Sequence, residues 1–142
     1  MHTKKFWITF VVVFVVMEVL GYLIHGVILA ETYAAEPLKS IFRSEEEMMS
    51  MMWVMYLMDL VWAYFFVFFF AKGYENKGIG EGLRYGLYIG LFFNLVFSYS
   101  SYAIYPLTYG IVLQWFIYGL IVSLILGVVA SFTFKPVAAK TE

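Results

Sequence analysis

The sequence predicts an all-α integral membrane protein, a bundle of four transmembrane helices with both termini in the cytoplasm. Of its 142 residues, 63% are hydrophobic and only 13% are charged, whereas soluble domains carry about 25% charged residues. A chain this short cannot hide so much apolar surface in a single core. Four apolar segments are long enough to cross the hydrocarbon of a bilayer, which takes about 20 helical residues.

The predicted spans cover residues 6–30, 48–71, 82–105 and 109–134, within a single membrane domain of residues 1–142. An outer loop over 31–47 and an inner loop over 72–81 join them, and Pro106 ends the third helix. Ser44 and Glu47 have the spacing of a capping box, which predicts the start of the second helix. The first apolar run is longer than the core of a signal peptide and contains Glu18, so we expect a retained span.

The orientation follows from the basic residues. Two of them, Lys39 and Arg43, fall in the outer loop, and seven fall on the side of the termini: Lys4, Lys5, Lys72, Lys77, Arg84, Lys135 and Lys140. Because basic residues are retained on the cytoplasmic side, both termini are predicted to be cytoplasmic. The net charge of −1 and the lack of a basic patch give no reason to expect nucleic-acid binding. Without cysteine there is no disulfide or thiolate ligand.

Small residues recur every fourth position in the last two spans, so they share one helix face. Such stripes let backbones approach closely in lipid and drive helix packing. The stripes could meet each other or a partner subunit, and we favour contact within the chain. The residues expected to pack are Gly82, Gly86 and Gly90 in the third span with Gly119, Ser123 and Gly127 in the fourth.

Several polar side chains lie within the apolar spans. From the helical rise, Glu18, Asp59 and Asn94 lie roughly 16–18 Å from the span ends, near the midplane. His25 and Gln114 fall in the outer third. Glu18 and His25 share a helix face, which should point into the bundle. No lysine or arginine lies at mid-depth. At least one of the two carboxyl groups is therefore expected to be neutral and hydrogen-bonded to the other carboxyl, to Asn94 or to a tyrosine.

This polar layer supports three interpretations. Its members could act as interhelical hydrogen-bonding groups, which contribute about 0.6 kcal/mol per contact. They could form the path of a proton-coupled transporter or channel for small solutes or ions, with Glu18 and Asp59 titrating and His25 as the outer relay. A cation on a neighbouring protein could also pair with the acids.

Methionines gather at the outer end of the second span in the segment "EEEMMSMMWVMYLM". Thioethers can bind Cu(I), and a Cu(I) site would use Met48, Met51, Met52 and Met55. The segment resembles the copper-transporter family of three-helix trimers, which pairs a Met-x-x-x-Met helix with a Gly-x-x-x-Gly helix. This chain has four spans instead of three and no Cys/His tail. Methionine is also a flexible filler of helix contacts, and we favour that role.

Catalytic and cofactor motifs are not apparent. Neither histidine has a second one at ligand spacing, which argues against a zinc or bis-histidine haem site, although His25 could ligate a cofactor in a larger complex. The segment "KGIGEG" lacks the strand that a dinucleotide fingerprint needs. We therefore expect no cofactor and no enzymatic activity.

The segments "ETYAAEPLKSIFRSEEEMMSMMW", "KGYENKGIGEGLRYGLYIG" and "YAIYP" resemble a group of small bacterial four-helix membrane proteins. The resemblance implies a bacterial inner-membrane location and brings no assigned activity. The function expected is that of a non-enzymatic structural or accessory subunit, in contact with membrane lipids. It would pack with copies of itself or within a larger membrane complex.

Overall fold

The computed structural model describes residues 3–135, which contain helices and no strand. Four helical stretches in this part of the chain are long and apolar enough to cross a membrane: Lys4–Ile28, Met52–Lys72, Ile79–Ile104 and Tyr109–Thr133. The predicted all-α fold with four such helices is confirmed. Lys140, one of the basic residues that predict the orientation, lies outside the described residues.

Two of the long helices contain a π-helical segment. The first consists of α1 (Lys4–Gly21) followed by η1 (Tyr22–Ile28), and the third consists of α6 (Ile79–Gly90), η2 (Leu91–Leu95) and α7 (Val96–Ile104). A π-helical turn holds more residues than an α-helical turn, so it rotates the side chains that follow it to another direction. The last helix, α8 (Tyr109–Thr133), is α-helical throughout.

The second predicted span is interrupted near its outer end. Ser44 forms the predicted capping box with Glu47, but the helix it starts, α4 (Glu45–Ser50), ends before Met51. The hydroxyl of Ser50 donates to the Glu47 carbonyl at 2.7 Å, and such a local bond competes with helix continuation. The long helix α5 (Met52–Lys72) begins after this break. Two short helices, α2 (Ala30–Ala34) and α3 (Leu38–Ile41), lie earlier in the same loop.

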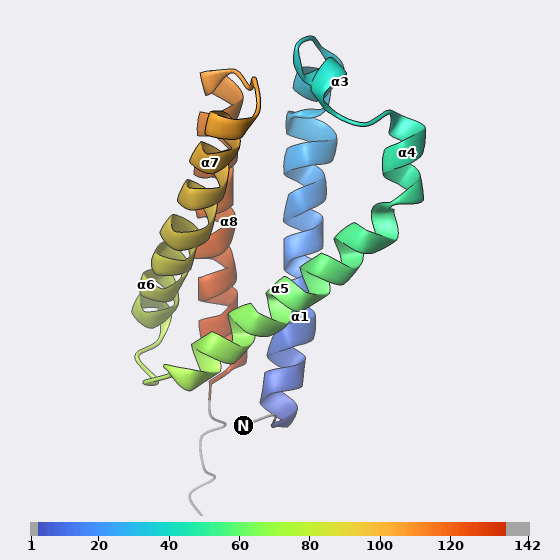
Figure 1. The fold of residues 1–142 in the computed structure, drawn as a ribbon. Helices are drawn as coiled ribbons and strands as arrows, with labels where there is room; N and C mark the ends of the chain where they lie inside the picture. The colour runs from blue at the N-terminus through green and yellow to red at the C-terminus, as the bar shows by residue number, and fades with distance from the viewer. Residues whose placement is uncertain (1–2, 136–142) are drawn as a thin grey trace, which may run out of the picture.

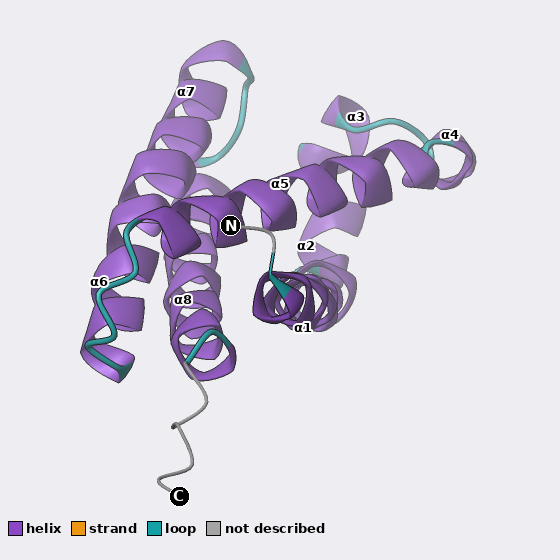
Figure 2. Ribbon diagram, turned by 90° about the horizontal axis from the view of Figure 1, so that it is seen from below, coloured by secondary structure: helices purple, strands orange, loops and turns teal. Residues whose placement is uncertain are grey.

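The four long helices do not form a closed bundle along their whole length. The α6–α7 helix runs beside α8, and α1 packs against α8 and α5 (Figure 1). Helix α5 crosses the molecule obliquely, so that its outer half and α4 lie away from the other helices (Figures 1 and 2). The start of α1 and the end of α8 lie at the same end of the bundle. We call this the terminal end.

The closest helix contact joins α6 to α8 through the two small-residue stripes. A Cβ atom at Gly82 would collide with the backbone carbonyl of Gly127, and one at Gly86 would collide with that of Ser123. At Gly90 a Cβ atom would lie 2.7 Å from a methyl group of Leu120. The two backbones are therefore in contact, which only glycine permits at these positions.

Two apolar clusters fill the rest of the interior. The cluster at the terminal end joins α1, α5 and α8, and its largest buried members are Phe6, Phe66 and Phe70. The hydroxyl of Tyr85 donates to the Phe66 carbonyl at 2.5 Å and ties α6 to α5 there. The second cluster, at the opposite end, packs α2 and α3 onto the start of α8: Ile24, Leu29, Leu38, Leu107, Ile111 and Val112.

Candidate functional site: a carboxyl pair within the membrane-spanning helices

Glu18 of α1 and Asp59 of α5 come together where these two helices cross. Their carboxyl groups lie close enough to interact with each other. Both side chains are half-buried. The second oxygen of Glu18, Oε1, is buried and has no hydrogen-bond partner among the described residues.

The other members of the predicted polar layer do not join this pair. Asn94 donates from Nδ2 to the Ser123 hydroxyl at 3.1 Å, and its side chain lies against Gly119. It therefore belongs to the contact between the third and fourth spans. Gln114 is exposed on α8. The midplane layer that we expected from depth alone is divided between two separate helix contacts.

His25 lies in η1 and is exposed, so the expectation that it shares an inward face with Glu18 is wrong. The π-helical segment that begins at Tyr22 changes the α-helical spacing on which that expectation depended. Its Nδ1 atom lies 2.6 Å from the hydroxyl of Tyr33, and the two rings stack at 5.9 Å. This histidine therefore belongs to a different polar group, at the opposite end from the termini.

Tyr33 holds α2 against α8. The indole nitrogen of Trp115 donates to the Tyr33 hydroxyl at 2.8 Å. Because an indole N–H can only donate, the Tyr33 hydroxyl accepts this bond and bridges Trp115 to His25. Burial raises the pKa of Tyr33 despite the opposing effect of the Trp115 hydrogen bond. This group was not predicted from the sequence, since Tyr33 and Trp115 are 82 residues apart.

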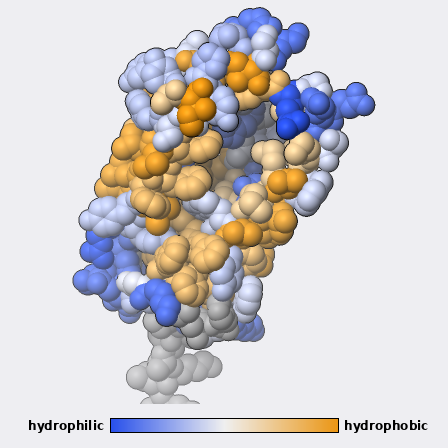
Figure 3. Space-filling view, viewed as in Figure 1, coloured by the Kyte–Doolittle hydropathy of each residue, from blue (hydrophilic) through white to orange (hydrophobic). Residues whose placement is uncertain are grey.

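One face of the molecule is hollowed. Figure 3 shows a depression between the α7 side and the α5 side, with hydrophobic residues around it and paler, more hydrophilic ones inside. The rings of Trp62 and Phe93 meet edge to face at 6.2 Å and bring α5 and η2 together. Towards the end opposite the termini, α5 diverges from α7 (Figure 1).

The methionines of α4 and α5 lie on the part of the chain that points away from the bundle. Met48, Met49, Met51, Met55 and Met58 are all exposed, and Met52 is half-buried. They do not fill a contact within this chain, as the packing interpretation would require. Their exposure leaves an apolar surface on the N-terminal half of α5.

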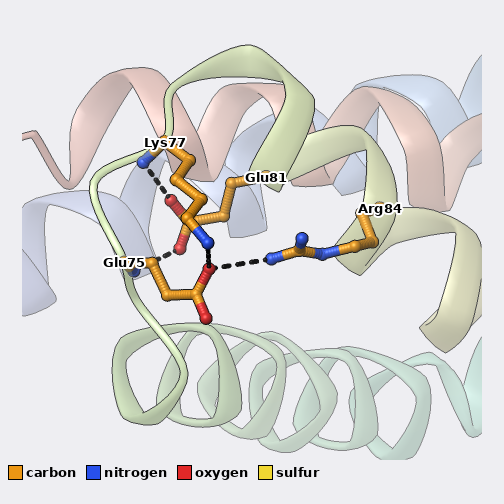
Figure 4. Close-up of polar contacts among 4 residues, drawn as sticks. All are labelled: Glu75, Lys77, Glu81 and Arg84. Atoms are coloured by element: carbon orange, nitrogen blue, oxygen red, sulfur yellow. Dashed lines mark hydrogen bonds and ion pairs between the residues drawn. The ribbon is translucent and has the colours of Figure 1, made fainter.

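A compact polar cluster organises the loop between α5 and α6 (Figure 4). The buried carboxylate of Glu81 accepts hydrogen bonds from the backbone N–H of Glu75 at 2.6 Å and of Lys77 at 2.8 Å. Glu75 in turn pairs with Lys77 at 2.6 Å and with Arg84 at 3.1 Å. From the sequence this segment is predicted only as an inner loop. The signal available was a glutamate placed shortly after the N-terminus of a helix.

The ion pairs of this loop are expected to stabilise it in a pH-dependent way. The Lys77 ammonium, followed by the Arg84 guanidinium, lowers the pKa of Glu75 below its ordinary value. A carboxyl group with a lowered pKa in the folded state contributes stability above its unfolded pKa and loses it as the pH falls through the folded pKa. We expect Glu75→Gln to lower the thermal unfolding midpoint at about pH 7 and to match the unchanged protein near pH 2.

Circular dichroism in detergent would measure both midpoints. Glu46→Gln, which changes an exposed carboxylate on α4, serves as the control and should leave the midpoint unaltered at both pH values. A difference between Glu75→Gln and the unchanged protein that is equal at the two pH values would contradict an electrostatic role of Glu75.

Comparison with known proteins gives no relative for this chain. No family model matches it, and no curated protein and no solved structure matches it either. The function must therefore be argued from the geometry.

Proposed function

We propose that this protein is a non-enzymatic accessory subunit of a membrane assembly, and that its half-open bundle receives a helix of another chain. The half-exposed Glu18–Asp59 pair carries this proposal. A carboxyl group near the middle of the hydrocarbon is costly, and such groups face protein rather than lipid. Because Glu18 and Asp59 are both only half-buried, the chain alone covers the pair incompletely. A neighbouring helix would complete the enclosure.

The amount of exposed apolar surface supports the same proposal. In the four candidate spans, between 11% and 28% of the residues of the most apolar window are buried inside the molecule. Lipid covers part of the remaining exposed apolar surface. Because α5 is placed obliquely, its surface and that of the α6–α7 helix meet at an angle. Two helix surfaces of this shape can hold a third helix by van der Waals packing.

We further propose that the protein resides in the inner, cytoplasmic membrane of a bacterial cell with both termini in the cytoplasm. The described basic residues support this orientation. Five of them lie in the first turn of α1, at the end of α5 or in the loop and first turns that lead into α6, and Lys135 follows α8; Lys39 and Arg43 lie at the opposite end. Basic residues on the cytoplasmic side satisfy the positive-inside rule.

The second candidate is a proton-coupled transporter or channel for a small solute or ion. The proximity of the Glu18 and Asp59 carboxyl groups favours it, since ionisable residues within membrane spans are typical of proton relays. The separation of His25 from this pair removes the outer relay that the path was expected to use. We therefore rank this function second.

Two measurements separate the candidates. For an accessory subunit, particles extracted from the native membrane into lipid nanodiscs should have a protein mass well above the 16.5 kDa of one chain. Purified protein in liposomes should also leave an imposed pH gradient intact. Collapse of the gradient by the unchanged protein, but not by Glu18→Gln, would establish the transporter instead. Particles of one chain would contradict the accessory role.

A further inference from the structure

A small cavity lies where α5 ends and α6 begins, and we call it the α5–α6 cavity. Glu81 and Arg84 line it, and residues 81, 84, 85 and 88 share one face of α6 because they are spaced three and four apart. One charged residue of each sign therefore lies beside a group of aromatic rings. The volume of the cavity is about 100 Å³, and its aromatic lining consists of Phe69, Phe70, Tyr85 and Tyr88.

Part of this lining is held in place by contacts between the two helices. The Tyr85 hydroxyl donates to the Phe66 carbonyl of α5, and the Tyr85 ring meets the Phe70 ring edge to face at 5.2 Å. The side chains of Phe69 and Tyr88, in contrast, are 52% and 62% exposed. Two of the four rings are thus fixed within the protein, and two are accessible from outside it.

The lining favours an occupant that carries both an ammonium group and a phosphate. The faces of aromatic rings attract cations, and several rings around one small site are typical of the recognition of alkylammonium ligands. Arg84 provides for the anion. Its guanidinium has five N–H donors, and among the described residues it uses one hydrogen bond, to Glu75 at 3.1 Å. The planar fork of a guanidinium is well suited to a phosphate.

The depth and charge of the surrounding cluster indicate where such a ligand would come from. The cavity lies at the shared end of two candidate spans, Met52–Lys72 and Ile79–Ile104, where lipid headgroups border the hydrocarbon. An anionic headgroup gains no net attraction from a cluster whose charges cancel, whereas a headgroup with one charge of each sign can pair with both. The cluster has two acidic and two basic members: Glu75, Glu81, Lys77 and Arg84.

We propose that the α5–α6 cavity binds the headgroup of a phospholipid that carries an ammonium group. The ammonium group lies among the aromatic rings beside Glu81, and the phosphate is bound by Arg84. The exposed rings of Phe69 and Tyr88 contact the lipid where its acyl chains begin. This binding requires only that the spans lie in a bilayer, so it holds for an accessory subunit and for a transporter alike.

The test compares two lipids with identical acyl chains, phosphatidylethanolamine and phosphatidylglycerol. Both contain the phosphate, and only the first contains an ammonium group. Native mass spectrometry of the purified protein in detergent counts the bound lipids over a range of lipid concentrations. We expect phosphatidylethanolamine to bind at least about tenfold more tightly than phosphatidylglycerol. Free phosphoethanolamine should compete weakly, and competition as strong as that of the whole lipid would overturn the assignment to a lipid.

Two kinds of variant test the roles of the rings and of the guanidinium. Phe69→Leu/Tyr88→Leu keeps an apolar surface without the rings and should abolish the preference for phosphatidylethanolamine. Phe65→Leu is its matched control, since Phe65 is 47% exposed one turn earlier on α5 and does not line the cavity. Arg84→Gln should weaken phosphatidylethanolamine binding about fivefold. Lys72→Gln, which removes a cation at the end of α5 outside the cavity, should leave this binding unaltered.

Circular dichroism establishes that each variant keeps the helix content of the unchanged protein. Equal binding of the two lipids by the unchanged protein, or tighter binding of phosphatidylglycerol, would overturn the inference. A preference that persists in Phe69→Leu/Tyr88→Leu, or that Phe65→Leu abolishes equally, would do so as well. These results leave the accessory role standing, because that role fails separately if particles from the native membrane contain one chain alone.

Discussion

Replacing Gly127 with leucine is expected to separate α6 from α8 and to unfold most of the protein in mild detergent. A Cβ atom at this position would collide with the carbonyl of Gly82 and lie 3.0 Å from the amide nitrogen of Gly86. Neither backbone atom can turn away as a side chain can, so the helices must move apart. Overpacking a well-packed contact typically costs about 1–3 kcal/mol, and the leucine side chain should reach the upper end of this range or exceed it.

Two glycines of the same helices lie outside the α6–α8 contact and serve as matched controls. A Cβ atom at Gly110 in α8 or at Gly80 in α6 would meet nothing within 4 Å. Alanine has a higher helix propensity than glycine by about 1 kcal/mol. Gly110→Ala and Gly80→Ala should therefore be neutral or stabilising, whereas Gly127→Ala should destabilise. The sodium dodecyl sulfate fraction at half-unfolding, followed by circular dichroism, measures all three. A Gly127→Leu protein as resistant as the unchanged one would show that this contact does not hold the helices together.

The sequence predicted this contact well because the information is local. Helical residues four apart share a face, and small residues in lipid indicate close packing. The stripe of small residues therefore predicts both the helix and the face of the helix that is buried. What the stripe could not give is the partner, since either a second chain or the neighbouring helix could supply it. The structure places Gly82 and Gly86 against the backbone of residues 123–127 of the same chain.

The carboxyl pair was predicted only in part. Counting residues along the helices places Glu18 and Asp59 at similar depths in the membrane. Depth alone allows their pairing, but it allows several other pairings of polar side chains as well. Asn94 has the same depth and lies instead against α8. His25 was assigned to the face of Glu18 by α-helical spacing, but η1 changes that spacing. Depth is a property of the sequence, whereas the direction of a side chain depends on local helix geometry and on the angle between helices.

The shape of the bundle could not be read from the sequence at all. Four apolar spans of similar length predict four helices, and they say nothing about the crossing angle of α5. That angle depends on contacts between distant residues, such as the ring of Trp62 against Phe93. The hollow, the exposure of the methionines and the incomplete enclosure of the carboxyl pair all follow from this one angle.

Replacing Glu81 with alanine is expected to destabilise the connection between α5 and α6 by about 3 kcal/mol, because two hydrogen bonds to a charged group are lost and each contributes roughly 1.5–3 kcal/mol. Its carboxylate is 4% exposed and accepts from the backbone of Glu75 and Lys77. Asn76 and Gly78 in this loop both have positive φ angles. The ion pairs of Glu75 also hold this loop. The Glu81 carboxylate differs from them in that it accepts directly from the backbone N–H groups of Glu75 and Lys77.

A series of substitutions at Glu81 distinguishes the effect of its charge from that of its two acceptor oxygens. Glu81→Gln keeps the shape but has one acceptor oxygen, so it should retain one of the two backbone bonds and lose about half of the effect of alanine. Glu46→Ala, an exposed change on α4, should leave stability unaltered. Unfolding in mixed micelles gives the free energies, and amide exchange at Glu75 and Lys77 reports the loop directly. Unchanged exchange in Glu81→Ala would mean that the loop is held by its ion pairs. Rapid amide exchange in the loop while the α6–α8 contact stays intact would show that the loop and the helix contact fold independently. We expect this result because the two contacts involve different residues.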